Sequence, residues 1–100
     1  KNLSYKEATH GVLCNTVAPA FIATPMTDAM MQQRADQLGV SFEAAIDSFL
    51  EKERPGISAK RRGEAREVAH VIAMLASEHA SFVSGSNIRV DGGSVISVQN

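Results

Sequence analysis

The stretch NTVAPAFIATPM, residues 15–26, decides how this chain of 100 residues folds. It leaves an apolar run, turns at Pro19, and passes through Thr24 and Pro25 into a segment of helical character. Thr24 suits the N-cap position, where its hydroxyl accepts a backbone N–H, and Pro25 suits the first helical position, where a missing N–H costs nothing. The stretch therefore predicts a strand, a loop and a helix start in immediate succession.

The residues before this loop predict the end of one helix and then a buried strand. Residues 1–10 are polar and compatible with the last turns of a helix, and Gly11 suits the left-handed position that ends one. Residues 12–18 form a near-continuous apolar run with β-branched members, which is typical of a parallel strand covered on both faces.

Two helices are predicted directly after the loop. The first covers residues 25–38 and ends at Gly39, and the second begins at Ser41, an N-cap candidate, and stops at Pro55. The second helix has the clearer amphipathic pattern, with apolar side chains at helical spacing: Phe42, Ala45, Ile46, Phe49 and Leu50.

A third helix and a second strand follow a charged link. The helix runs from Glu64 to near Ser77, residues 87–90 form the strand, and the sequence DGG at residues 91–93 marks a turn. The helix carries one apolar side, formed by Val68, Val71, Ile72 and Leu75.

The order of these elements predicts an α/β fold. A strand, crossover helices and a second strand imply parallel pairing, because such a connection needs a dozen or more residues. Two strands do not make a sheet that is stable by itself. We therefore expect the chain to form part of a larger α/β domain.

Composition excludes several classes of protein. A net charge of −1, with 44% apolar and 21% charged residues, is ordinary for a globular protein and gives no general attraction to nucleic acid. No apolar run approaches the roughly 18 residues of a membrane span, and the first residues do not resemble a signal peptide. Cys14 is the single cysteine, which excludes an internal disulfide and favours a reducing compartment, with the cytoplasm as the default.

The loop at residues 18–24 is the first candidate for a binding site. In open parallel α/β sheets, ligands bind outside the carboxyl ends of the strands, which is where this loop falls. Backbone N–H groups and the Thr24 hydroxyl can hold an amide or a phosphate at the start of the following helix. On position alone, a purely structural interpretation is favoured, with Thr24 as an N-cap and Pro19 as a turn residue.

Other candidate side chains favour structural roles. Cys14, beside Asn15 and near His10, resembles a nucleophile with a base, but a cysteine in an apolar strand is usually a small buried hydrophobe. His70 and His79 have no second ligand at metal spacing, so we expect no metal site.

The basic cluster KRR, residues 60–62, is flanked by acids and lacks interleaved aromatic residues. This pattern favours a solvated turn over a nucleic-acid surface, with a phosphate contact as the lesser alternative. Met26, Met30 and Met31 suit either an adaptable apolar pocket or core packing, because methionine fills irregular space.

A phosphate-binding pattern and a catalytic pattern are both missing from the sequence. The seven glycines form neither G-x-G-x-x-G nor a P-loop, which are the phosphate-binding turns of nucleotide-binding folds. The only tyrosine, Tyr5, is followed four residues later by Thr9, so the chain has no Tyr-x-x-x-Lys arrangement for general acid–base work.

Two segments together carry a resemblance to a known family. GVLCNTVAPAFIATPM, residues 11–26, and RRGEAREVAHVIAMLASEHASFVSGSNIRVDGG, residues 61–93, resemble the C-terminal part of a short-chain dehydrogenase/reductase. The N-x-V-x-P segment, the R-x-G-x-x-x-E-V-A helix entry, the SFVSG segment and the terminal V-D-G-G occur in the family's order. The match extends from residue 1 to about Val98.

The resemblance implies the C-terminal part of a Rossmann-type, doubly wound parallel sheet. Residues 12–18 and 87–90 correspond to its last two strands. Residues 1–24 would contain a helix end, a strand and the nicotinamide loop, residues 25–54 a helical lid over the substrate, and residues 64–98 the last helix, last strand and tail.

The resemblance also implies a cofactor, NAD or NADP, whose nicotinamide half contacts the loop after residue 18. Ile22 would contribute its backbone to the carboxamide, and Thr24 its hydroxyl to the carboxamide or the phosphates. The residues carried over as cofactor contacts are Pro19, Ala20, Ile22, Thr24 and Met26.

The chain departs from the family pattern in three respects. Ala20 stands where the family usually has glycine, which narrows the allowed backbone, and Ala65 stands where it often has proline, which loosens the helix start. The family's glycine-rich loop, catalytic serine and Tyr-x-x-x-Lys pair would precede residue 1. We therefore assign no catalytic residue and do not expect this chain alone to turn over substrate.

The implied activity is hydride transfer between a nicotinamide cofactor and a small carbonyl or alcohol substrate. Both 3-oxoacyl-thioester reductases and sugar or polyol dehydrogenases remain open, and a homo-oligomer, dimeric or tetrameric, would form through the last helix and last strand. The alternative is a catalytically inactive fragment that acts only as a structural or oligomerisation module. Nucleic-acid binding through residues 60–62 has the least support.

Overall fold

The computed structural model describes residues 2–94, with the backbone alone at positions 2 and 8. Residues 95–98 of the predicted tail lie outside the described residues. The elements in chain order are α1 (Asn2–Ala8), β1 (Thr16–Pro19), β2 (Ile22–Ala23), α2 (Pro25–Leu38), α3 (Phe42–Glu53), β3 (Gly63–Glu64), α4 (Ala65–Leu75), a short 3-10 helix (Glu78–Ala80) and β4 (Asn87–Val90).

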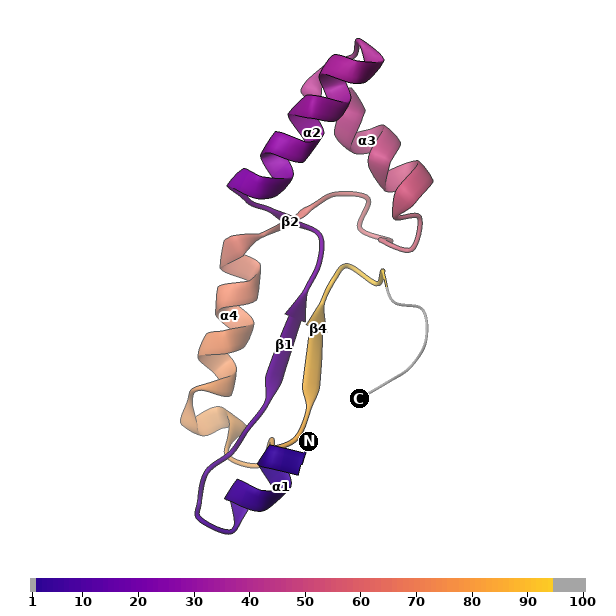
Figure 1. The fold of residues 1–100 in the computed structure, drawn as a ribbon. Coiled ribbons are helices and arrows are strands. Elements are labelled where there is room, and N and C mark those ends of the chain that lie inside the picture. Colours follow the sequence, from indigo (N-terminus) through magenta and orange to yellow (C-terminus); the bar gives the residue numbers. More distant parts are fainter. Residues whose placement is uncertain (1, 95–100) are drawn as a thin grey trace.

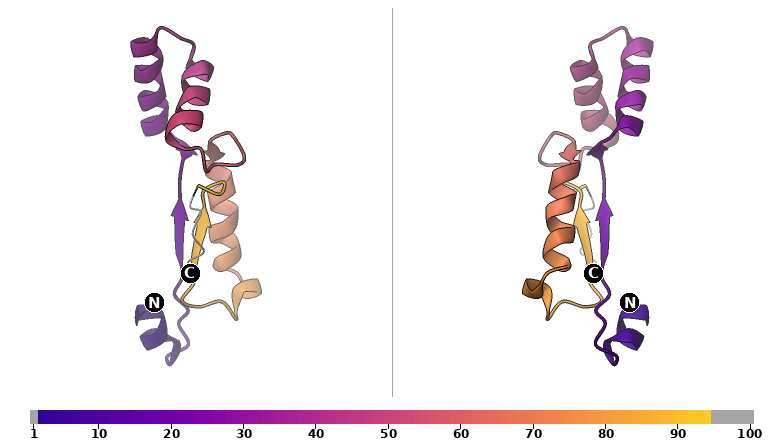
Figure 2. Two further views of the ribbon diagram at one scale, coloured as in Figure 1. Left: turned by 90° about the vertical axis from the view of Figure 1, so that its right-hand side faces the viewer. Right: turned by 90° about the vertical axis from the view of Figure 1, so that its left-hand side faces the viewer.

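The described part of the chain is elongated, with extents of 56 × 25 × 19 Å. Strands β1 and β4 lie side by side in the middle, and the hairpin of α2 and α3 stands beyond their carboxyl ends (Figure 1). Helix α1 lies at the opposite end, and both views in Figure 2 show α4 running along the strands. The loop after β1 therefore lies between the strand pair and the helical hairpin.

The parallel pairing predicted from the element order is confirmed. β1 and β4 pair in parallel, from Thr16 opposite Asn87 to Pro19 opposite Val90. The connection between them contains α2, α3 and α4, as a parallel crossover requires. None of the described helices is long and apolar enough to span a bilayer.

The helix boundaries predicted from capping residues are confirmed. Thr24 is the N-cap of α2, with extended φ and ψ of −132° and 165°, and Gly39 ends the helix at a left-handed φ of 66°. This conformation suits glycine because a Cβ disfavours it. Ser41 caps α3 by accepting the Ala44 N–H at 3.1 Å.

Helix α4 begins at Ala65, without the proline that the family often has there. The Glu67 carboxylate accepts the Glu64 N–H at 2.9 Å, which satisfies one of the donors that a helix start leaves unpaired. No described residue of α4 is fully buried, and Ile72 and Met74 on this helix are exposed. Its apolar side therefore covers β1 only in part.

The prediction of a buried strand over residues 12–18 was wrong in two respects. β1 begins only at Thr16, and Val12 and Leu13 are exposed, while Val17 and Ala18 are half-buried. An apolar run indicates a strand that neighbours cover, but the described residues supply β1 with one pairing strand. Residues 12–18 therefore have the composition of a central strand, but the described residues do not cover them as neighbours cover a central strand.

A second parallel pair, between β2 and β3, was not predicted. Ile22 lies opposite Gly63 and Ala23 opposite Glu64, and the Phe21 carbonyl accepts the Gly63 N–H at 3.0 Å. The two strands approach closely, since a Cβ at position 63 would lie 2.9 Å from Ile22 Cδ1. This pair joins the entry and the exit of the helical hairpin.

The core lies between the helical hairpin and its connections rather than on the strand pair. Phe21, from the loop after β1, packs against Phe49 of α3 with ring centroids 5.0 Å apart. The buried cluster consists of Phe21, Met31, Leu50 and Ile57, with Phe42, Ile46 and Phe49 packed against it. The loop that carries the candidate site is thus anchored by its own buried phenylalanine.

Candidate functional site

The loop between β1 and α2 presents its first residues to solvent. Pro19 and Ala20 are exposed, and the next residue, Phe21, is buried. Among the described residues, Lys60 is the non-glycine residue with positive φ, so the φ of Ala20 is not in the left-handed region, and the peptide bond from Ala20 to Phe21 is cis. The alanine that replaces the family's glycine is therefore accommodated without left-handed geometry.

The amide of Ile22 faces the start of α2. The neighbouring Phe21 carbonyl is bonded to Gly63 of β3, and successive residues of a strand direct their N–H and C=O groups to opposite sides. The Ile22 carbonyl accordingly accepts the Thr27 hydroxyl at 2.5 Å, on the side of α2. Since both polar groups of one strand residue point the same way, the Ile22 N–H also faces that side.

The Thr24 side chain acts as the N-cap of α2, as predicted. Its Oγ1 accepts the Thr27 N–H at 3.2 Å, and the Thr27 Oγ1 accepts the Thr24 N–H at 3.0 Å, which completes a capping box. This cap uses Thr24 Oγ1 as an acceptor, and a hydroxyl has one proton in addition to its lone pairs. Capping therefore does not consume the donor of Thr24.

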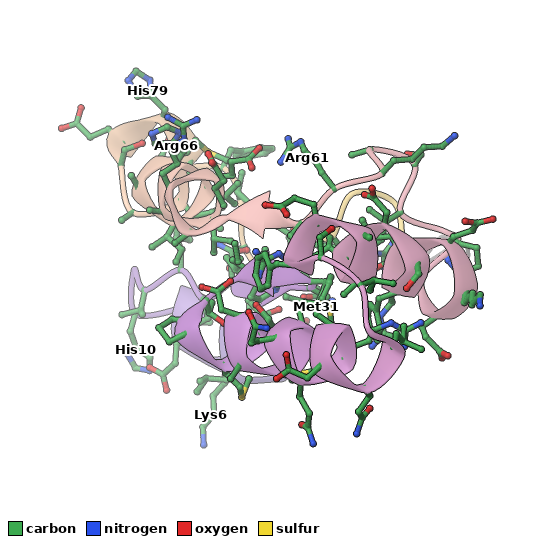
Figure 3. The ribbon with its side chains drawn as sticks, turned by 90° about the horizontal axis from the view of Figure 1, so that it is seen from above. Lys6, His10, Met31, Arg61, Arg66 and His79 are labelled. Carbon is green, nitrogen blue, oxygen red and sulfur yellow. The ribbon has the colours of Figure 1, made fainter. Side chains whose placement is uncertain are left out.

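The three methionines of α2 divide between surface and core. Met31 is 1% exposed, whereas Met26 is 72% and Met30 44% exposed. Figure 3 shows Met31 between α2 and α3. Core packing is thus the role of Met31, while Met26 lies at the exposed first turn of α2, where helix N–H groups lack intrahelical acceptors.

A small cavity lies on the other side of the loop. It has a volume of about 70 Å³, and its lining includes Ala20, Phe21, Gly63 and Asp91. Asp91 is buried; its Oδ1 accepts the Gly93 N–H at 3.1 Å, and its Oδ2 lies 4.0 Å from Arg89 Nε. The sequence predicted only a turn at Asp91, since nothing local signals that its carboxylate is buried.

Arg62 was predicted to lie in a solvated turn, and this prediction was wrong. Its side chain is 11% exposed, and Nη1 donates to Thr27 Oγ1 at 3.1 Å and to Asp28 Oδ1 at 2.6 Å. The guanidinium carbon also lies 5.6 Å from the centroid of the Phe42 ring. Arg62 reaches α2 across 34 positions of sequence, so no local pattern could have indicated it.

Its neighbour Arg61 remains at the surface and bonds to α4. Nη1 and Nη2 donate to the two carboxylate oxygens of Glu67 at 2.8 and 3.0 Å. The Arg61 hydrogen bond, followed by the backbone N–H of Glu64, lowers the pKa of Glu67 to about 2. Arg61 and Arg62 thus differ in burial and in the helix that each contacts.

The remaining candidates lie away from this loop. Cys14 is half-buried and precedes β1, and His10, His70 and His79 are exposed. Figure 3 shows His10 and His79 near the periphery of the molecule. Among the described residues, no three His, Cys, Asp or Glu side chains are grouped to hold a metal ion.

The predicted contact residues come together because they belong to one short loop and the helix start that follows. Pro19, Ala20 and Met26 are exposed around it, while Ile22 and Thr24 are half-buried. The Ile22 amide and the Thr24 hydroxyl supply two hydrogen-bond donors at the N-terminus of a 14-residue helix. Such an arrangement suits a ligand with a carbonyl or another electron-rich oxygen.

Comparison with known proteins gives consistent matches over nearly the whole chain. Residues 1–95 match the family described as enoyl-(acyl carrier protein) reductase. The chain is 37% identical over 93 residues to the 3-oxoacyl-[acyl-carrier-protein] reductase FabG of Rickettsia conorii. The aligned region covers 93% of this chain and 32% of that protein. It is 36% identical over 98 residues to the NADPH-dependent reductase BacG of Bacillus subtilis. Here the aligned region covers 98% of this chain and 36% of that protein.

A solved structure has a similar fold over nearly the whole chain. The crystal structure of a short chain dehydrogenase family protein from Francisella tularensis matches with a TM-score of 0.82 and 27% identity, covering 97% of this chain and 38% of that one. The chain thus spans about a third of the length of the curated relatives it matches.

Proposed function

Because the chain belongs to the short-chain dehydrogenase/reductase family, we propose that it forms the nicotinamide-side part of an NAD(P)-dependent oxidoreductase. The reaction would transfer hydride between the cofactor and a small carbonyl or alcohol substrate. One relative is named as a 3-oxoacyl-[acyl-carrier-protein] reductase and another as an NADPH-dependent reductase. Both 3-oxoacyl thioesters and sugars or polyols are candidate substrates.

We propose that the chain corresponds to the C-terminal part of the family's Rossmann-type domain. The order of β1, the α2–α3 hairpin, α4 and β4, with β1 and β4 in parallel, supports assigning β1 and β4 to the last two strands. The hairpin would then be the substrate lid, since it stands beyond the carboxyl ends of both strands, where ligands of such sheets bind (Figure 1).

The observation that carries the cofactor proposal is the pair of donors at the start of α2. The Ile22 N–H and the Thr24 hydroxyl lie at a helix N-terminus, beside exposed residues that leave the approach open, Pro19, Ala20 and Met26. A carboxamide has a carbonyl that accepts such hydrogen bonds. These residues fit the nicotinamide end of NAD or NADP.

The proposed role of this chain is to bind and orient rather than to transfer protons. When bound, the nicotinamide cofactor supplies or accepts the hydride. Ile22 and Thr24 would fix the rotation of the carboxamide, and the α2–α3 hairpin would exclude water from the substrate. The sequence has no Tyr-x-x-x-Lys arrangement, so other residues of the protein would supply the family's acid–base groups.

We further propose that the protein is a cytoplasmic homo-oligomer, a dimer or tetramer that assembles through α4 and β4. Ile72 and Met74 leave apolar surface of α4 exposed, and such surface supports a contact with another subunit. An inactive structural module remains the second candidate. It would assemble in the same way but would bind no dinucleotide.

Substitution of Thr24 tests the proposed function in the full-length protein. Thr24→Asp keeps an acceptor for the N-cap but removes the hydroxyl donor, so the protein should fold while its affinity for NADPH and NADH falls about tenfold. Thr24→Ser keeps the hydroxyl and should bind like the unmodified protein. Thr9→Ala is the matched control, because within the described residues the Thr9 hydroxyl makes a local bond, to the Lys6 carbonyl.

Isothermal titration with NADPH, NADH and ADP-ribose measures these affinities. ADP-ribose lacks the nicotinamide and its carboxamide, so its affinity reports the rest of the cofactor site. If the unmodified full-length protein binds none of the three compounds, the oxidoreductase proposal is wrong and the module is favoured. If Thr24→Asp binds NADPH and NADH as well as Thr24→Ser does, the role of Thr24 is wrong.

A further inference from the structure

Three segments of the chain meet at the hydroxyl oxygen of Thr27. This residue is buried in the first turn of α2. Its Oγ1 donates to the Ile22 carbonyl of β2 at 2.5 Å, accepts the Thr24 N–H at 3.0 Å, and accepts Arg62 Nη1 at 3.1 Å. The two residues that carry the proposed donors to the cofactor are therefore bonded to the same atom through other groups, Ile22 through its carbonyl and Thr24 through its backbone N–H.

The bonding capacity of this oxygen is fully used. A hydroxyl has one proton and two lone pairs. The proton occupies the short bond to Ile22, and the two lone pairs receive the Thr24 N–H and Arg62. The Thr24 Oγ1 also lies 3.3 Å from Thr27 Oγ1, close enough to donate its proton there if a lone pair were vacant.

Two further contacts hold Arg62 where it donates to the second lone pair of Thr27 Oγ1. Its Nη1 also donates to Asp28 at 2.6 Å, and its guanidinium lies over the Phe42 ring of α3. A charged donor bonds more strongly than a neutral hydroxyl, so Arg62 outcompetes the Thr24 hydroxyl for Thr27. The Thr24 proton is left to point away from the loop.

We propose that Arg62 is a positioning residue, which directs the Thr24 hydroxyl proton outward to the nicotinamide carboxamide by occupying the Thr27 oxygen. This inference rests on the proposed function. Without Arg62, the Thr24 hydroxyl turns inward to Thr27 and presents only a lone pair to the carboxamide oxygen. The loop would keep its fold but lose one of its two donors.

Substitution of two adjacent arginines tests this role in the full-length protein. Arg62→Met should weaken NADPH binding about tenfold, the value of one lost hydrogen bond, and should leave ADP-ribose binding unchanged. Arg62→Lys restores a charged donor and should recover most of the affinity. Arg61→Met is the matched control, because the Arg61 side chain bonds to Glu67 and to the Arg62 backbone carbonyl, with no bond to α2 among the described residues, and it should change neither affinity.

A double-mutant cycle separates this role from a general structural effect. Thr24→Ala should weaken NADPH binding in the unmodified protein but cause little further loss in the Arg62→Met background, since the proton is already turned inward. Full additivity of the two losses would overturn the proposal. Equal weakening of ADP-ribose and NADPH by Arg62→Met would also overturn it, because the effect would then not be specific to the nicotinamide.

Folding of the variants is checked by thermal unfolding. If Arg62→Met does not fold, Arg62→Gln is used instead, because its side chain is polar but too short to reach Thr27, and the same loss of NADPH affinity is expected. If NADPH and ADP-ribose bind the unmodified protein and Arg62→Gln changes neither affinity, this inference is wrong while the proposed function stands. If the unmodified protein binds neither compound, the proposed function itself is wrong.

Discussion

Two consecutive methionines of α2 give a sharp test of where the core lies. Met31 is 1% exposed and Met30 44%, although both belong to one helix and one residue type. Met31→Ala removes three buried side-chain atoms, Cγ, Sδ and Cε. If each counts as a methylene at about 0.8 kcal/mol, the lost transfer free energy is roughly 2.4 kcal/mol. The cavity left behind adds to this, so we expect a loss of about 3 kcal/mol in the free energy of unfolding.

Met30→Ala should cost below about 1 kcal/mol, because much of its side chain is already in water and alanine favours the helix. Urea unfolding of the full-length protein measures both variants, with hydrogen exchange of the α2 amides to detect opening of the hairpin alone. Equal losses for the two variants would refute the assignment of Met31 to the core. A loss confined to exchange at α2 would place the damage in the hairpin.

Two further predictions concern stability. The pKa of Glu67 is about 2 in the folded protein, below its ordinary value, so its ion pair with Arg61 stabilises the fold above about pH 4.5 and the stabilisation is lost as the pH falls toward 2. The difference in Tm between the unmodified protein and Glu67→Gln should therefore shrink from pH 5 to pH 2, and a difference that stayed constant would contradict this ion pair. Gly56→Ala would place a Cβ 2.9 Å from the Ser94 backbone oxygen and should cost about 1–3 kcal/mol in urea unfolding, whereas Gly63→Ala meets only the flexible end of Ile22 and should cost less.

Helix boundaries were predictable because their causes are local. The bounds of α2 follow from Thr24 and Pro25 at one end and Gly39 at the other, where cap chemistry depends on residues within a few positions. The contact residues proposed for the loop rest on a different kind of argument. Position alone favoured a purely structural Thr24, and the resemblance to a family added the proposed cofactor role.

The features that were missed depend on residues far apart in the sequence. The Arg62–Asp28 pair joins positions 34 apart, and β2 and β3 are two residues each, too short for any periodic pattern. The buried stripe of α2 consists of Thr27, Met31 and Ala35. Because one of these three residues is polar and another is alanine, the helix has no clear apolar periodicity. The sequence therefore could not show which methionine is buried.

The cover of β1 illustrates a related limit. A strand is apolar on both faces when other parts of the folded protein cover both faces. The composition of the strand therefore does not show which residues cover it. Residues 12–18 have that composition, but Val12 and Leu13 are exposed among the described residues.

The short β2–β3 pair has a consequence for how the family can diversify. The α2–α3 hairpin leaves the chain after Ala23 and returns at Gly63, and these two points are held next to each other by backbone hydrogen bonds. Because the two ends of the hairpin are fixed to one another, the length and sequence of the hairpin can change while the loop after β1 and α4 keep their spacing. If the hairpin is the substrate lid, as proposed, its exchange would be a route to new substrate preference that keeps the loop after β1 and α4 in place.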